Sequence, residues 1–275
     1  MKLSCLPVSF YPDLIAGRMS LGEWARMGRE LGLDAVDASI LFFVDRSEKA
    51  LSRARREVEV EGMSLGMMST YPDFTHPEAW ARAREIDAAR ETVDVAVELG
   101  MSYVRAIAGQ AHPETELEAG IAWAVDGLRA VVEQSRGTGV EVVYENHDQA
   151  GVMDYPDFSA RQEVFLQIVE STAPFDLGIN YDTGNATALT PDPLALLEAV
   201  LDRVRTLHVS DTSAVGAHIR PCVIGAGLAP LEAIFSQLHQ AGWDGYLSIE
   251  EASGMGRAGV ETGVGHVRRL WERTK

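Results

Sequence analysis

The chain contains little cysteine and little basic charge. Cys5 and Cys222 are its only two cysteines among 275 residues, too few and too far apart for a disulfide framework or a Cys-rich zinc site. Lys and Arg number 24 against 41 Asp and Glu, a formal net charge of −17. An acidic field of this size repels a nucleic-acid phosphate backbone. We therefore expect a cytoplasmic protein, in a reducing compartment, without a nucleic-acid partner.

The sequence also lacks a long hydrophobic run. Nowhere do about 18 apolar residues follow one another without a charge, as a membrane-spanning helix requires. The apolar stretch of the N-terminal segment is cut by Pro7 and followed by Pro12 and Asp13, a pattern unlike that of a signal peptide. Hydrophobic residues make up 46% and charged residues 24% of the chain, which is typical of globular proteins. We expect a soluble protein with a large core and no membrane partner.

Helical and strand-length segments alternate along the chain. Apolar residues recur at helical spacing in the segments 20–32, 46–61, 77–99, 115–136, 160–171, 193–202, 229–241 and 257–273. Apolar runs of strand length lie between them, at 3–10, 35–40, 63–68, 103–108, 140–145, 177–182, 205–210 and 246–251. Several predicted helices end at a glycine that leads directly into a strand, as in ELGLDAV and ELGMSYV. The repeating unit is therefore one strand followed by one helix.

Eight such units predict an α/β fold with a parallel sheet. A strand joined through a helix to a parallel neighbour makes a right-handed crossover, and eight units in about 250 residues most simply close into a (β/α)8 TIM barrel. An open doubly wound sheet is the alternative, but the GxGxxG turn of a dinucleotide-binding sheet is absent after the first strand. No low-complexity linker divides the chain, so we expect a single TIM-barrel domain over residues 1–275.

The ends of four consecutive predicted strands carry potential metal ligands. In a TIM barrel the carboxyl ends of the strands meet at one mouth, where catalytic groups lie. A single acidic residue there is usually a helix N-cap or a solvated loop residue, but four ligands in succession favour a functional site. Three carboxylates and an imidazole suit Mn²⁺, Mg²⁺ or Co²⁺ better than a structural zinc. The residues are Glu145 in VVYENHD, Asp182 in GINYDTGN, His208 in TLHVSD and Glu250 in LSIEEAS.

The motifs ENH, DTGN and HVSD, followed by IGAGLAPLEAIFSQLHQAGWDGYLSIEE, resemble the sugar-phosphate isomerase/epimerase family with a xylose isomerase-like TIM barrel. That family includes ketose 3-epimerases, hydroxypyruvate isomerases, inosose dehydratases and 3-dehydroshikimate dehydratases. The resemblance implies that Glu145, Asp182, His208 and Glu250 together bind one divalent metal ion. Mn²⁺ is the expected ion, with Mg²⁺, Co²⁺ or Zn²⁺ as alternatives.

The resemblance also implies an activity. We expect a metal-dependent isomerase or epimerase of a small polyhydroxy carbonyl compound, a sugar or sugar derivative, that abstracts a proton next to a metal-bound carbonyl and forms an enediolate. In the family's epimerases the two glutamates, here Glu145 and Glu250, flank opposite faces of the substrate, so that one abstracts a proton and the other returns it. If the intermediate instead expels a β-hydroxyl, the site is that of a lyase acting on a keto-sugar, keto-inositol or dehydroshikimate-like compound.

Two other classes of function are alternatives to these enzymes. The first is a non-catalytic barrel that binds a sugar or serves as a scaffold subunit. For either kind of function, the protein could also form a homo-oligomer. The apurinic endonucleases of the same superfold are the other, but they need several more metal-binding histidines, and the charge of −17 disfavours DNA. A small-molecule, carbohydrate-like substrate is therefore the expected partner.

Two positions depart from the ketose 3-epimerase pattern. Asn185 stands three residues after the strand-six Asp, where those enzymes have a histidine that contacts substrate. Gly151 lies near the place of a second glutamate that the pattern has beyond Glu145. The predicted metal site is unaffected, whereas a ketohexose substrate is not supported. Asn185 remains a candidate substrate-binding residue.

Three residues near the predicted mouth could assist the chemistry or bind substrate. His147, two residues past Glu145, is a candidate acid–base residue or an ordinary loop residue. Arg220 lies in the loop after the seventh strand, where family members place a basic residue over the substrate, although a surface arginine explains it nearly as well. His218 lies in the same loop and is open to the same two interpretations.

Arg105 and Tyr71 are further candidates for substrate binding. Arg105 ends the fourth strand and either binds a substrate oxyanion or pairs with a buried carboxylate such as Asp37 or Glu141, and the pairing is favoured. Tyr71 follows the third strand and either forms a wall of the pocket or packs locally.

Two features of the loops complete the predicted mouth. The loop 146–160 is long and aromatic enough to act as a lid. Asp211, three residues after His208, is predicted either to orient that histidine or to cap the next segment.

Overall fold

The computed structural model describes residues 1–216 and 218–275. Its eight strands are parallel and form one sheet in the order β1-β8-β7-β6-β5-β4-β3-β2, which follows the chain around a nearly closed barrel. The predicted (β/α)8 TIM barrel is therefore confirmed. The strands are β1 (Lys2–Leu6), β2 (Val36–Ser39), β3 (Leu65–Ser69), β4 (Tyr103–Ala106), β5 (Glu141–Glu145), β6 (Gly178–Asp182), β7 (Val204–Val209) and β8 (Tyr246–Glu250).

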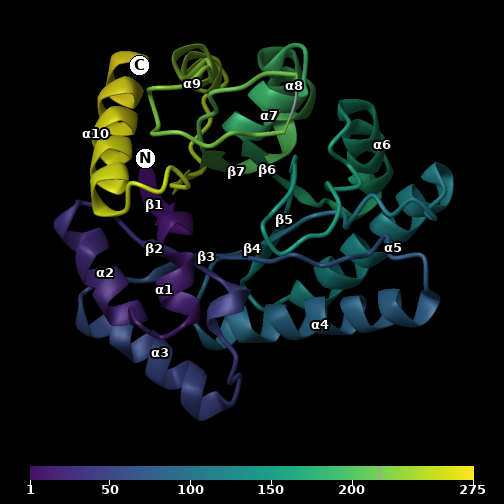
Figure 1. Ribbon diagram of the computed structural model, residues 1–275, viewed down its shortest axis with the longest axis horizontal. Helices are drawn as coiled ribbons and strands as arrows, with labels where there is room; N and C mark the ends of the chain where they lie inside the picture. The colour runs from purple at the N-terminus through teal and green to yellow at the C-terminus, as the bar shows by residue number, and fades with distance from the viewer. Residues whose placement is uncertain (217) are drawn as a thin grey trace.

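All eight predicted helices are present, and they surround the strands (Figure 1). Two short helices were not predicted, α1 (Tyr11–Ile15) after β1 and α7 (Thr183–Leu189) after β6. The described residues also form four 3₁₀ turns, η1 (Val8–Phe10), η2 (Ile40–Phe42), η3 (Ala173–Phe175) and η4 (Leu201–Arg203). The predicted helices are α2 (Leu21–Glu30), α3 (Glu48–Val60), α4 (Ala79–Glu98), α5 (Leu117–Ser135), α6 (Gln162–Thr172), α8 (Pro193–Val200), α9 (Leu231–Gln240) and α10 (Arg257–Arg273).

Local sequence signals set the ends of these helices. Ser20 and Glu23 form a capping box that starts α2, each side chain accepting the other residue's backbone N–H. Gly32 and Gly100 follow α2 and α4 with φ angles of 80° and 71°. Glycine adopts this left-handed conformation at little cost, so the chain turns directly into the next strand. The ring of helices closes where Arg257 of α10 contacts Glu30 of α2 at 2.8 Å.

Side chains close the seam of the barrel between β1 and β2. In the described chain these two strands share no backbone ladder. Instead, Asp37 on β2 accepts hydrogen bonds from Ser4 Oγ of β1 and Ser248 Oγ of β8, both at 2.5 Å, and from the Met67 N–H of β3 at 2.9 Å. Burial raises the pKa of the Asp37 carboxyl in spite of these bonds. Asp37 is therefore a structural carboxylate at the seam.

The core lies between the sheet and the surrounding helices. Fully buried side chains include Trp24 on α2, Phe165 on α6 and Phe235 on α9. The Trp24 indole N–H donates to the Asp37 carbonyl at 3.3 Å, so its polar atom is satisfied in the core. Of the helices among the described residues, none is long and apolar enough to cross a membrane.

Candidate metal centre and active site

The four predicted ligands converge at the mouth of the barrel. Glu145, Asp182 and Glu250 end their strands, and His208 lies one residue before the end of β7. Strand register sets Asp182 beside His208, because β6 and β7 pair at these residues. One ligand atom from each of the four residues lies within 4.8 Å of every other. We call these four residues the ligand cluster.

His208 sits between two carboxylates of the ligand cluster. Its Nδ1 atom lies 2.6 Å from Glu145 Oε1 and 2.9 Å from Glu250 Oε2. Burial disfavours a charged imidazole, but the two carboxylates outweigh burial and raise the pKa of His208 to about 10. The imidazole therefore carries the charge that is closest to both glutamates.

Glu145 is held in place from several sides. Asn180 Nδ2 donates to Glu145 Oε1 at 2.8 Å, and Thr206 Oγ1 in turn donates to Asn180 Oδ1 at 2.7 Å. Burial alone raises the pKa of a carboxyl, but Arg105 and His208 outweigh it and lower the pKa of Glu145 to about 2. Glu145 is consequently an ionised and fully buried carboxylate.

Arg105 does pair with a buried carboxylate, but with a different one from those expected. Its Nε atom lies 3.1 Å from Glu145 Oε2, and both side chains are almost completely buried. The expected partners are engaged elsewhere, Asp37 at the β1–β2 seam and Glu141 with Arg205 at 3.2 Å. Asp37 and Glu141 are out of reach because they lie deeper in the barrel or at its opposite end, whereas Arg105 and Glu145 both lie near the mouth.

Asp182 is also fixed in orientation. Its carboxylate accepts hydrogen bonds from Ser210 Oγ at 2.9 Å and from the Asn185 N–H at 2.6 Å, so that it caps α7. Burial raises its pKa well above the ordinary range, and the neighbouring Glu250 and Glu145 add to the rise. Three carboxylates in one buried place therefore repel one another.

The chemistry of the ligand cluster fits a divalent cation. It offers three carboxylates and one imidazole nitrogen, the mixture that hard divalent ions accept. The positive charges of Arg105 and His208 do not balance the three carboxylates, and a doubly charged ion would relieve the repulsion that raises the pKa of Asp182. The contact of Glu145 Oε2 with Arg105 Nε is an ion pair without hydrogen-bond geometry, so this buried oxygen accepts no hydrogen bond from the described residues.

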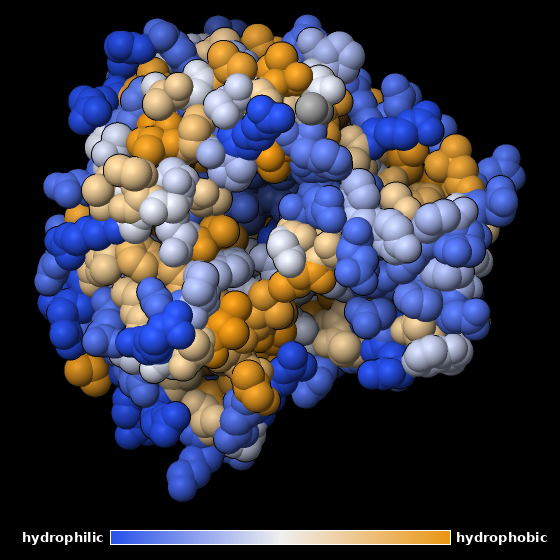
Figure 2. All heavy atoms as spheres, viewed as in Figure 1, coloured by the Kyte–Doolittle hydropathy of each residue, from blue (hydrophilic) through white to orange (hydrophobic). Residues whose placement is uncertain are grey.

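A pocket of about 400 Å³ lies above the ligand cluster. Its walls include five residues that the sequence predicted for the site: Tyr71, Arg105, His147, Asn185 and Glu250. Figure 2 shows a hollow near the middle of this face, with hydrophilic atoms inside it and hydrophobic atoms gathered along one edge. The structure thus combines a charged floor with a pocket large enough for a small molecule.

Two predicted substrate contacts lie away from this pocket. His218 and Arg220 are exposed and are not among the residues that line it. His218 Nδ1 lies 2.8 Å from Asp148 Oδ1, and the Arg220 N–H donates to Thr212 Oγ1 at 3.1 Å. The structure therefore does not bring these two side chains to the ligand cluster.

Asp211 organises the loop before α9 and does not orient His208. It accepts backbone hydrogen bonds from Gly225 and Gly227 at 2.9 Å and from Ala229 at 3.0 Å. The second of the two interpretations from the sequence, the capping of the next segment, matches this arrangement. The short spacing to His208 was misleading because the Asp211 carboxylate faces the returning loop.

The predicted lid has a fixed half and a half that faces the pocket. Gln110 Oε1 accepts the Asp154 and Tyr155 N–H groups at 2.7 and 3.1 Å, and the Phe158 N–H donates to the Gly109 carbonyl at 2.9 Å. The segment 149–152 lines the pocket. Any lid movement is therefore expected in that segment.

Several wall residues carry no motif and could not be found from the sequence. Tyr11 of α1 is one of them, and its hydroxyl lies 3.1 Å from that of Tyr71. These residues lie on the loops and short helical turns after the strand ends, which show no periodic pattern. The apolar members, which we call the apolar wall, are Val8, Ile15, Leu41, Val152, Ile219 and Pro221.

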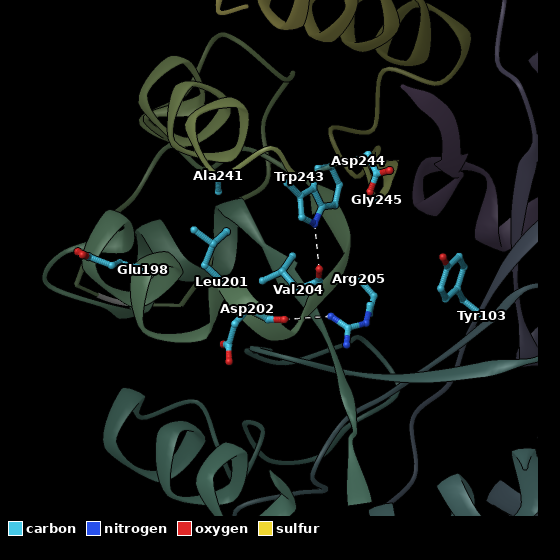
Figure 3. A pocket seen from close by; sticks show the side chains of 10 residues that line it. All are labelled: Tyr103, Glu198, Leu201, Asp202, Val204, Arg205, Ala241, Trp243, Asp244 and Gly245. Carbon is cyan, nitrogen blue, oxygen red and sulfur yellow. Dashed lines mark hydrogen bonds between the residues drawn. The ribbon is translucent and has the colours of Figure 1, made fainter.

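A second pocket, of about 720 Å³, lies at the opposite end of the barrel, around the amino ends of β4, β7 and β8 (Figure 3). There the Trp243 indole N–H donates to the Val204 carbonyl at 2.9 Å, and Arg205 Nη1 donates to the Asp202 carbonyl at 3.1 Å. These polar groups are satisfied within the protein. Since catalytic groups of TIM barrels lie at the carboxyl ends of the strands, we place the candidate site at the ligand cluster.

Curated proteins with similar sequences are an epimerase and a dehydratase by name. "Putative L-ribulose-5-phosphate 3-epimerase SgbU" of Escherichia coli (strain K12) is 25% identical over 263 residues, which cover 88% of this chain and 87% of that protein. Inosose dehydratase of Geobacillus thermodenitrificans (strain NG80-2) is 24% identical over 142 residues, 46% of this chain and 45% of that protein.

Solved structures share the whole fold. A structure of L-ribulose 3-epimerase matches with a TM-score of 0.79 and 16% identity over 100% of this chain and 96% of that chain. The IOLI protein with a bound zinc atom matches with a TM-score of 0.77 and 16% identity, over 100% and 99%. The family model described as xylose isomerase-like TIM barrel matches residues 25–270. The chain therefore belongs to the xylose isomerase-like TIM-barrel family.

Proposed function

We propose that the protein is a divalent-metal-dependent isomerase or epimerase of a small polyhydroxy carbonyl compound. The observation that carries this proposal is the convergence of Glu145, Asp182, His208 and Glu250 within 4.8 Å beneath a pocket of about 400 Å³. These four residues would hold the ion, with Mn²⁺ as the first candidate. When bound, such an ion supplies Lewis acidity that makes a C–H group next to a carbonyl more acidic.

The two glutamates would move the proton. Glu250 lines the pocket with 24% of its side chain exposed, whereas Glu145 is fully buried behind it. One carboxylate accepts a proton from the substrate carbon, and the other, as a carboxylic acid, donates a proton to the opposite face. Because the two groups exchange protonation states in this step, exchange with solvent must restore them before the next turnover.

His147 is a second candidate for acid–base work. It lines the pocket, and its Nδ1 atom is buried without a hydrogen-bond partner among the described residues, 4.0 Å from Asp157 Oδ2. Burial lowers the pKa of His147 below its ordinary value, so the neutral imidazole prevails at neutral pH. A neutral imidazole can both accept and donate a proton.

A lyase reaction is the second candidate function, supported by the sequence match to an inosose dehydratase. Both reactions begin with removal of the same proton. Incubation of metal-loaded protein with ketoses and keto-compounds in D₂O separates them. Deuterium incorporation with epimer formation is expected for the isomerase or epimerase, whereas a new conjugated-enone absorbance would favour the dehydratase.

The same experiment needs a control for a non-catalytic barrel. Elemental analysis of the purified protein and thermal unfolding with added Mn²⁺ give that control. A protein without divalent metal whose unfolding midpoint does not respond to Mn²⁺ would contradict both enzyme hypotheses.

A further inference from the structure

The pocket above the ligand cluster is poor in available positive charge. Among the described residues that line it, Arg105 is the single Lys or Arg. Arg105 is 1% exposed and pairs with Glu145 at 3.1 Å. Its charge is therefore already matched by a carboxylate of the protein.

The site would also carry no excess positive charge after a divalent metal ion has bound. Glu145, Asp182 and Glu250 contribute three negative charges. Arg105 contributes one positive charge, and a divalent ion would contribute two. With His208 as a neutral ligand the sum is zero, so no positive charge remains to compensate a phosphate or carboxylate on a substrate.

Backbone N–H groups could also bind an anion, but several of those around the mouth donate to side chains of the protein. A glycine-rich loop with convergent N–H groups is a common anion-binding device, and the IGAGLA segment after β7 has this form. Its Gly225, Gly227 and Ala229 N–H groups all donate to the carboxylate of Asp211, which is 2% exposed. The Asp211 carboxylate, an internal anion, thus occupies the three donors of this loop.

Neighbouring N–H groups at the mouth are engaged in the same way. The Gly184 N–H donates to Ser210 Oγ at 2.9 Å, and the Asn185 N–H donates to Asp182 Oδ1 at 2.6 Å. The Ile219 N–H, beside the pocket, donates to Asp148 Oδ2 at 2.7 Å. Each donor is therefore occupied by the protein itself.

The rest of the pocket lining is better suited to contact C–H groups of a substrate than to contact charged groups. The apolar wall is contributed by the chain segments after β1, β2, β5 and β7, and Figure 2 shows hydrophobic atoms along one edge of the hollow. An anion placed against such a wall loses hydration without gaining a partner, which is costly. The C–H face of a sugar or a cyclitol loses little hydration there.

We infer that the substrate is a neutral polyhydroxy ketone that carries neither a phosphate nor a carboxylate group. This inference rests on the proposed function, which it narrows. The reacting end lies at Glu250 and the carbon face lies against the apolar wall. A free ketose or keto-inositol fits this description, whereas a ketose phosphate or a dehydroshikimate-like acid does not.

The test compares matched neutral and anionic compounds on the full, Mn²⁺-loaded chain. L-Ribulose and L-ribulose 5-phosphate form one pair, an inosose and 3-dehydroshikimate serve as a neutral and an acidic ring compound, and inorganic phosphate is the simplest anion probe. Calorimetry measures binding, and proton exchange in D₂O measures chemistry. We expect each anionic compound to bind at least about tenfold more weakly than its neutral counterpart, the effect of one uncompensated charge. We also expect inorganic phosphate to show no site with a Kd below about 1 mM.

A gain-of-binding variant makes the test two-sided. Val152→Lys adds a cation to the apolar wall and is expected to raise the affinity for L-ribulose 5-phosphate about tenfold. The matched control is Val60→Lys on α3, an exposed valine outside the pocket, which should change nothing. Equal or tighter binding of the phosphate ester by the unmodified chain, or a phosphate site with a Kd below about 1 mM, would overturn the inference. Absence of proton exchange with every compound would instead overturn the proposed function, because the binding results are read independently.

Discussion

The two ends of the barrel both carry charged side chains beside a pocket, but their charges are arranged differently. At the amino end of the strands, Arg205 pairs with Glu141 at 3.2 Å, and both side chains are partly exposed. At the carboxyl end, Glu145, Asp182 and Glu250 converge within reach of one another, two of them fully buried. The first is a partly exposed ion pair that water screens, whereas the second is a cluster of carboxylates that is largely shielded from water. A buried cluster of like charges is typical of functional sites, where a bound cation or substrate compensates them.

Removal of a metal ligand at the mouth should have the largest effect of the variants compared, because it lowers the metal affinity directly. Asp182→Ala and His208→Ala each delete one donor of the ligand cluster. We expect metal affinity to fall by more than the about 10–100-fold typical of residues that only support a ligand, while the barrel remains folded. Elemental analysis together with circular dichroism measures both quantities. Stoichiometric metal in both variants would contradict the assignment of the ligand cluster.

Neutralising either glutamate should reduce turnover more than metal binding. Glu145→Gln and Glu250→Gln keep one oxygen donor but lose basicity, so net conversion should fall about 10²–10⁴-fold. Because Glu250 lines the pocket, Glu145→Gln is expected to retain exchange of the substrate proton with solvent. Steady-state kinetics at saturating Mn²⁺ and deuterium exchange measure the two effects. If either variant kept full activity, that glutamate would not be an acid–base residue, and His147 would become the preferred candidate.

Metal binding should also raise the thermal stability of the folded chain. A ligand that binds only the folded state adds about 2.7 kcal/mol of stability at a concentration of one hundred times its Kd. We therefore expect Mn²⁺ to raise the thermal midpoint of the metal-free chain. Asp182→Ala is the matched control and should show no such rise. An unchanged midpoint in the unmodified chain would indicate that the cluster does not bind Mn²⁺.

The smallest effect is expected at the opposite end of the barrel. Arg205→Ala removes a partly exposed ion pair, which is typically worth less than about 1 kcal/mol. Denaturant unfolding should show this small loss, whereas metal content and turnover should remain unchanged. A loss of metal in this variant would show that the two ends are coupled.

The sequence alone predicted the barrel and the convergence of the ligand cluster. Both predictions depended on local patterns: apolar runs of strand length, helical periodicity, and the polar residue that ends each run. In a parallel barrel the carboxyl ends of all strands meet at one face, so a residue's place along its strand already determines its place at the mouth. The convergence of Glu145, Asp182, His208 and Glu250 follows from this rule.

The ion-pair partners of the charged residues and the residues that form the pocket wall depended on the tertiary structure. α1 is too short to show a helical period, so Tyr11 and Ile15, which it brings to the pocket, carried no motif in the sequence. Arg105 contacts Glu145 because β4 and β5 pair in a particular register, and several carboxylates were equally plausible partners without it. Arg220 lies near the right motif but is exposed, since nearness in sequence does not determine which way a loop side chain points. Contacts between residues that are distant in sequence depend on how the barrel closes, and only the folded chain determines them.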